Sequence, residues 1–80
     1  MRLPRDVSGR RLAKLLERYD YVIVRQRGSH VRLERRGSDA APLTIPDHDA
    51  LRVGTLRAIL TAVGEATSYD RETIERDLFG

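Results

Sequence analysis

The chain contains no cysteine and no long hydrophobic run. Its longest uninterrupted apolar stretch, Tyr21 to Val24, has four residues, whereas a helix needs about 20 to cross a bilayer. The absence of cysteine excludes disulfides, thiolate zinc sites and a cysteine nucleophile. We predict no transmembrane helix, and because no apolar segment of a secretory signal follows the first residues, we expect a cytoplasmic protein.

The composition is that of a small folded domain. The chain has 80 residues, of which 40% are hydrophobic and 34% charged, so it is too hydrophobic for a disordered tail. This length is well below that of two average domains. We therefore predict a single domain over residues 1–80, with its core in residues 8–64 and a C-terminal helical extension in residues 65–80.

Acidic residues are scarce in the first part of the chain. Residues 1–36 carry 11 basic and 4 acidic residues, a net charge of +7, and the remainder carries 4 and 8, a net charge of −4. All but one of the 15 cations are arginine, whose planar guanidinium suits bidentate phosphate contacts. A nucleic-acid partner is one interpretation, and arginine-rich codon usage with an ordinary solvated basic face is the other. Charge alone does not distinguish them.

Two stretches repeat apolar residues with the i, i+3, i+4, i+7 spacing of one helix face. They are Leu12, Leu15, Leu16 and Tyr19, and then Leu56, Ile59, Leu60 and Val63. We predict a first helix from Ser8, as N-cap, to Asp20, which tolerates the left-handed conformation of a helix exit. For the second helix, Gly54 or Thr55 is expected to cap the start and Gly64 to end it.

Three short segments between the helices have the composition of strands. They are residues 21–27, 30–35 and 43–45, the last ended by Pro46. Gly28-Ser29 is typical of a type II′ hairpin turn, in which the first residue has a positive φ. Alternation along the second strand places Val31 and Leu33 on one face, with His30, Arg32 and Glu34 on the other.

The element order α-β-β-β-α predicts an α+β domain. Its short connections favour a three-stranded antiparallel sheet with the helices on one face, and residues 68–79 form a weaker apolar stripe that predicts an extra helix. This order matches double-stranded-RNA-binding domains, although such an analogy does not establish a function by itself.

His30 is the main candidate for chemistry. It follows a turn on the solvent-facing side of its strand, with Arg25, Arg27 and Arg32 nearby in sequence and Arg32 on the same face. An imidazole can act as general base near neutral pH, and guanidinium groups can stabilise charge on a phosphate. Together they meet the needs of metal-free RNA cleavage by a 2′-hydroxyl. The alternative is that His30 is merely an exposed strand residue.

His48 lies between Asp47 and Asp49, which raises the question of a metal site. The three residues match no spaced ligand motif, and adjacent loop residues seldom complete a coordination sphere. We favour pairing of the carboxylates with Arg52, or capping of the following helix. We therefore predict no metal and no cofactor.

Four motifs together resemble the HicA family of type II toxins. They are Ser8-Gly9-Arg10-Arg11-Leu12, the run from Val24 to Gly28-Ser29-His30, Ile45-Pro46-Asp47-His48, and Gly54-Thr55-Leu56-Arg57-Ala58-Ile59-Leu60. Gly-Ser-His alone is weak evidence for this family. Its combination with the last motif, at the right distance along the chain, is a specific signal. The resemblance covers residues 8 to about 64.

The resemblance implies a toxin that cleaves mRNA and is neutralised by a HicB-like antitoxin, with His30 as the catalytic residue. Arg25, Arg27 and Arg32 are expected to contact phosphates, and Gly28 with Ser29 to shape the turn. The family often has a histidine or an aromatic residue after the catalytic histidine, where this chain has Val31. That departure leaves open a non-catalytic RNA-binding or interaction module. The acidic segment after Gly64 is expected either to contact the antitoxin or to pack on the basic half.

Overall fold

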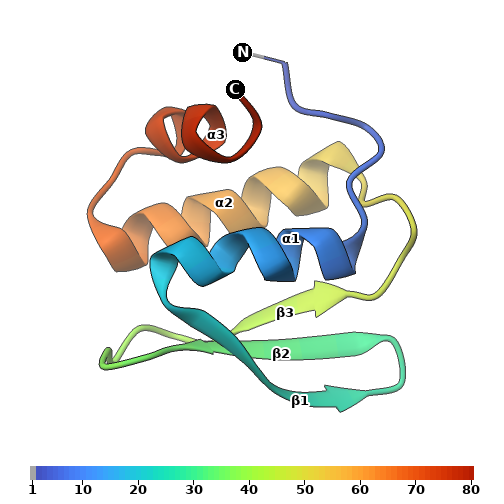
Figure 1. Ribbon diagram of the computed structural model, residues 1–80, viewed down its shortest axis with the longest axis vertical. Coiled ribbons are helices and arrows are strands. Elements are labelled where there is room, and N and C mark those ends of the chain that lie inside the picture. Colours follow the sequence, from blue (N-terminus) through green and yellow to red (C-terminus); the bar gives the residue numbers. More distant parts are fainter. Residues whose placement is uncertain (1) are drawn as a thin grey trace.

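The computed structural model describes residues 2–80 as a three-stranded antiparallel sheet with helices on one face (Figure 1). Its elements are α1 (Gly9–Leu15), a 3₁₀ turn (Leu16–Tyr19), β1 (Tyr21–Arg27), β2 (His30–Arg35), β3 (Leu43–Pro46), α2 (Val53–Thr67) and α3 (Arg71–Phe79). Helices α1 and α2 lie over the sheet, and α3 lies on the far side of α2 (Figure 1). The predicted α+β fold is confirmed. Within residues 2–80, no helix is long and apolar enough to span a membrane.

The first helix begins and ends as predicted. The Ser8 side chain accepts a hydrogen bond of 3.0 Å from the backbone N–H of Arg11, which satisfies one free donor of the first turn. The last turn tightens into the 3₁₀ segment, and Asp20 then takes the left-handed conformation with φ 68°. This exit leads directly into β1.

The second helix is longer than predicted, and its caps differ. Helix α2 starts at Val53 after the extended residue Arg52, without a side-chain cap, so neither Gly54 nor Thr55 caps it. It continues through Gly64 to Thr67 and ends at Ser68, which has φ 64°. Gly64 is required by packing instead, because a Cβ there would lie 2.8 Å from the carbonyl oxygen of Tyr69. The missing side chain lets the connection to α3 pass close to α2.

Helix α3 packs mainly on α2 and reaches the basic half of the chain through one acidic side chain, Asp77. Asp70 caps it by accepting a hydrogen bond of 2.7 Å from the N–H of Thr73, which lowers the pKa of the Asp70 carboxyl. Near its other end, Asp77 pairs with Arg18 at 3.4 Å and accepts a 2.7 Å hydrogen bond from the hydroxyl of Tyr19. The acidic segment therefore touches the basic half at Arg18 and Tyr19 and packs mainly on α2. Its expected contact with an antitoxin stays a prediction.

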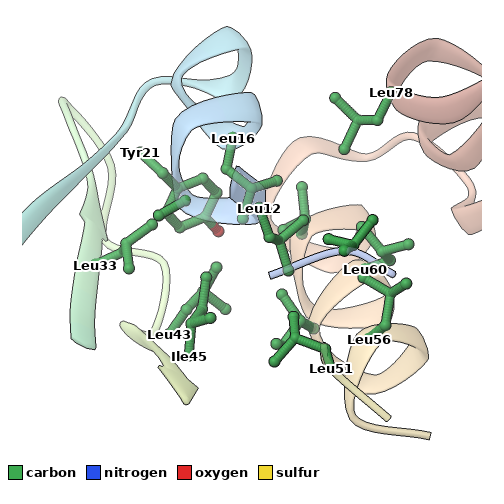
Figure 2. Close-up of a cluster of buried hydrophobic side chains, with 14 of the residues drawn as sticks. Leu12, Leu16, Tyr21, Leu33, Leu43, Ile45, Leu51, Leu56, Leu60 and Leu78 are labelled. Carbon is green, nitrogen blue, oxygen red and sulfur yellow. The ribbon is translucent and has the colours of Figure 1, made fainter. Parts of the chain in front are cut away.

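The hydrophobic core lies between the sheet and the helices (Figure 2). The strands contribute Val31, Leu33, Leu43 and Ile45, and the helices contribute leucines such as Leu12, Leu16, Leu56 and Leu60. Tyr21 is fully buried and its hydroxyl points into this cluster, without a hydrogen-bond partner among the described residues (Figure 2). The core therefore uses one face of the sheet and leaves the other face open.

Candidate active site on the open face of the sheet

The turn between β1 and β2 has the predicted geometry. Arg27 pairs with His30 across the hairpin, so Gly28 and Ser29 form the connection. Gly28 has φ 59°, whereas Ser29 stays outside the left-handed region. A positive φ at the first of the two central residues is what a type II′ turn requires. The turn therefore returns the chain at once and places His30 at the first position of β2.

Alternation along β2 puts His30 on the open face. Its neighbour Val31 is completely buried, and so is Leu33, whereas His30 is exposed and Arg32 is partly exposed. On β3, Thr44 pairs with Arg32 between two buried neighbours, and it therefore shares this open face. The side-chain directions predicted for β2 are confirmed.

Strand β1 contains a bulge that the sequence did not predict. Ile23 pairs with Leu33 and Arg25 pairs with Arg32, so one residue of β1, Val24, has no partner on β2. A bulge of this kind inserts one residue into a strand and changes the face on which the following side chains lie. Ile23 and Val24, at this point of the strand, are exposed at 46% and 47% of their surfaces.

The bulge brings the arginines of β1 to the histidine. Strict alternation from the buried Tyr21 would place Arg25 and Arg27 on the face covered by the helices. After the bulge, Arg25 is opposite Arg32 and Arg27 is opposite His30, so all of them share the open face. Arg25 and Arg27, which were only near His30 in sequence, thus join Arg32 beside it on the open face.

These side chains line one shallow depression with a volume of about 250 Å³. Its lining residues are Arg25, Arg27, His30, Arg32 and Thr44. Four of the predicted site residues therefore meet here, and the other two, Gly28 and Ser29, form the turn beside it. Sequence reasoning missed Thr44, although its position between the apolar Leu43 and Ile45 was a usable signal.

The depression is positively charged and open to solvent. Arg32 has an ion pair with Glu34, at 3.7 Å, and both side chains of this pair are largely exposed. By contrast Arg35, at the end of β2, donates to the carbonyls of Tyr19 and Ala66, at 2.9 and 3.3 Å. Arg35 therefore holds the ends of two helical segments together, whereas the arginines of the depression are available to an anion.

The Asp47-His48-Asp49 segment is used differently from the prediction. Asp47 pairs with Arg10 at 3.4 Å and accepts a hydrogen bond of 3.1 Å from Gln26. The expected pairing with Arg52 is therefore wrong, and so is the expected capping, since α2 has no side-chain cap. The actual partners come from α1 and β1, which sequence proximity could not reveal. Across residues 2–80, no group of three or more His, Asp or Glu side chains is placed to hold a metal ion.

Comparison with known proteins identifies the family. The model of the HicA toxin of bacterial toxin–antitoxin systems matches residues 9–64. This span contains the Gly28-Ser29 turn and every residue that lines the depression. No curated protein and no solved structure matches the chain. Because the family model covers more than half of the 80 residues, this chain belongs to the HicA family of toxins from bacterial toxin–antitoxin systems.

Proposed function

We propose that this chain is an endoribonuclease toxin that cleaves mRNA in the cytoplasm without a metal ion and thereby arrests translation and growth. A HicB-like antitoxin neutralises it. In this proposal residues 1–80 act as one toxin domain, with a core in residues 8–64 and a helical extension in residues 65–80. One observation carries the proposal, namely the exposed imidazole of His30 in a single depression with three arginines.

Each group has a defined role in the proposed reaction. His30 removes the proton from a ribose 2′-hydroxyl, whose oxygen then attacks the adjacent phosphorus. The bond from phosphorus to the 5′-oxygen breaks, that oxygen takes a proton from water, and a 2′,3′-cyclic phosphate forms. Arg25, Arg27 and Arg32 contact phosphate oxygens and stabilise the negative charge of the transition state. Gly28 and Ser29 keep His30 at the edge of the depression.

The decisive experiment compares the wild type with His30→Ala. Loss of the general base should lower the rate of RNA cleavage by about 10²- to 10⁴-fold and abolish growth arrest on expression without antitoxin. The melting temperature should stay unchanged, since His30 is exposed. His48→Ala is the matched control, because His48 is also exposed and does not line the depression. Equal cleavage by wild type and a folded His30→Ala variant would refute the proposal.

Cleavage should also persist in EDTA, because the proposed mechanism uses only side chains. Activity that disappears in EDTA and returns with added metal would contradict this mechanism.

A second candidate function is a non-catalytic RNA-binding module. It is favoured by one observation, the lack of any aromatic side chain in the lining of the depression, since bases commonly stack on such side chains. This module would bind RNA with an affinity that falls steeply with salt, because phosphate contacts release counterions. Binding of this kind without cleavage at any protein concentration would select it over the ribonuclease.

A further inference from the structure

The turn that carries His30 is held by side chains on the opposite side of the sheet. Gln26 is paired with Val31, so it lies at the edge of the face covered by the helices. Its amide nitrogen donates to the carbonyl oxygen of Gly28, at 3.0 Å, and to the carboxylate of Asp47, at 3.1 Å. Gln26 therefore links the first residue of the turn to the loop after β3.

The second residue of the turn is held by the same loop. The backbone N–H of Asp47 donates to the carbonyl oxygen of Ser29, at 2.7 Å. Both carbonyls of the turn, those of Gly28 and Ser29, are thus bonded to groups outside it. This restraint reaches the residue directly before His30 in the chain.

Arg10 connects this arrangement to the first turn of α1. Its guanidinium donates to the side-chain oxygen of Gln26 and pairs with the carboxylate of Asp47, at 3.4 Å. The start of α1 is itself fixed, because the N–H of Gly9 donates to the carbonyl of His48 at 2.9 Å. A Cβ at Gly9 would lie only 1.9 Å from the carbonyl oxygen of Pro46, so only glycine permits this close approach.

From these contacts we propose that Arg10, Gln26 and Asp47 are positioning residues for His30, an inference that rests on the ribonuclease function proposed above. None of the three lines the depression, so they act through the backbone of the turn and not by touching RNA. His30 itself is exposed, and no side-chain hydrogen bond restrains it among residues 2–80. The orientation of its imidazole therefore depends on the turn.

The main test measures kcat and KM separately for cleavage of a short RNA oligonucleotide by Gln26→Ala. A displacement of about 1 Å at a reacting group can cost about 10²-fold in rate, so we expect kcat to fall by about 10- to 100-fold. KM should change by less than about threefold, because the arginines that bind phosphate are untouched. A rise in KM with an unchanged kcat would overturn the proposal, since it would indicate a direct contact with RNA.

Matched variants separate positioning from charge and from stability. Arg10→Ala should lower kcat as Gln26→Ala does, whereas Arg11→Ala removes the same charge from the next residue of α1 and should keep the wild-type kcat. Asp47→Asn should retain more activity than Asp47→Ala, because its side-chain oxygen can still accept the bond from Gln26. Equal losses in Arg10→Ala and Arg11→Ala would show a charge effect and refute the positioning role.

A spectroscopic readout makes the inference independent of catalysis. In nuclear magnetic resonance spectra, Gln26→Ala should shift or broaden the resonances of Gly28, Ser29 and the His30 ring, while the melting temperature stays near that of the wild type. If Gln26→Ala has unchanged resonances and an unchanged kcat while His30→Ala is inactive, the positioning role is refuted. The ribonuclease function would then still be supported. If the wild type cleaves no RNA, the ribonuclease proposal fails, and the resonances alone decide whether these residues hold the turn.

Discussion

The two faces of the sheet are built by the same strands and differ in almost every physical property. On β2, the completely buried Val31 and Leu33 alternate with the exposed His30 and the partly exposed Arg32. The covered face meets leucines from α1 and α2 (Figure 2), and β2 contributes the apolar Val31 and Leu33 to it. The open face carries a histidine and three arginines around one depression.

This difference separates stability from chemistry at the level of single residues. Burial of apolar surface on the covered face supplies much of the free energy of folding. Charged groups on the open face keep their hydration, so they cost the fold little and remain free to meet an anion. Neighbouring residues of one strand should therefore give opposite phenotypes when they are replaced.

The largest effect on stability is expected from Leu33→Ala. Removing a completely buried leucine from a core typically lowers the free energy of unfolding by about 2–5 kcal/mol, which urea denaturation would measure. Cleavage per folded molecule should stay near that of the wild type, because the side chain lies on the face opposite His30. A loss below about 1 kcal/mol would contradict the role given to the covered face.

The reciprocal change, Arg32→Ala, should weaken RNA binding by about tenfold, close to 1.4 kcal/mol, through loss of a charged phosphate contact. The slope of log affinity against log salt should become shallower by about 1. The free energy of unfolding should move by less than about 0.5 kcal/mol, since the pair with Glu34 is exposed. Arg36→Ala is the control, because it removes the same charge from a residue outside the depression. If it weakens RNA binding as much as Arg32→Ala does, only the net charge of the protein matters.

Two tyrosines on either side of Asp20 sharpen the comparison between buried and exposed polar groups. Tyr21→Phe removes a buried hydroxyl that has no partner among residues 2–80, so it should raise the free energy of unfolding by about 1 kcal/mol. Tyr19→Phe loses the hydrogen bond to Asp77, so it should lower the free energy of unfolding by about 0.5–1.5 kcal/mol. Chemical denaturation would measure the free energy of unfolding of both variants. A lower value for Tyr21→Phe than for the wild type would contradict the expected stabilisation.

A dependence of stability on alkaline pH is also expected. Burial, followed by the hydrogen bond to Asp77, raises the pKa of Tyr19 from 10.0 to about 12. The folded state therefore favours the neutral phenol. Its contribution to stability is complete below pH 10 and is lost as the pH rises toward about 12.

Tyr19→Phe should flatten the decline of stability over this interval, which unfolding curves at several pH values would show. Burial also raises the pKa of Tyr21, so part of the decline should remain in Tyr19→Phe and become smaller in the double Phe variant. If the stability of Tyr19→Phe falls with pH as steeply as that of the wild type, Tyr19 is not the group responsible for the decline.

Much of the fold follows from short-range signals in the sequence. Ser8 and Asp20 bound the first helical segment as predicted, and Gly28 has the positive φ that its turn requires. These features depend on a few consecutive residues, so a local pattern is sufficient to predict them. The ends of α2 were predicted wrongly, because the glycine taken as its stop, Gly64, serves contact with the connection to α3.

Local patterns in the sequence are enough to predict the order of the elements, the α+β class and the open-face position of His30 on β2. The tertiary structure brings Arg25 and Arg27 to His30 as well, because the bulge at Val24 depends on the register of two paired strands. It also decided that Arg10, Gln26 and Asp47 meet behind the turn. Helix and turn propensities act over a few consecutive residues, whereas strand register and packing depend on segments that are far apart in the chain.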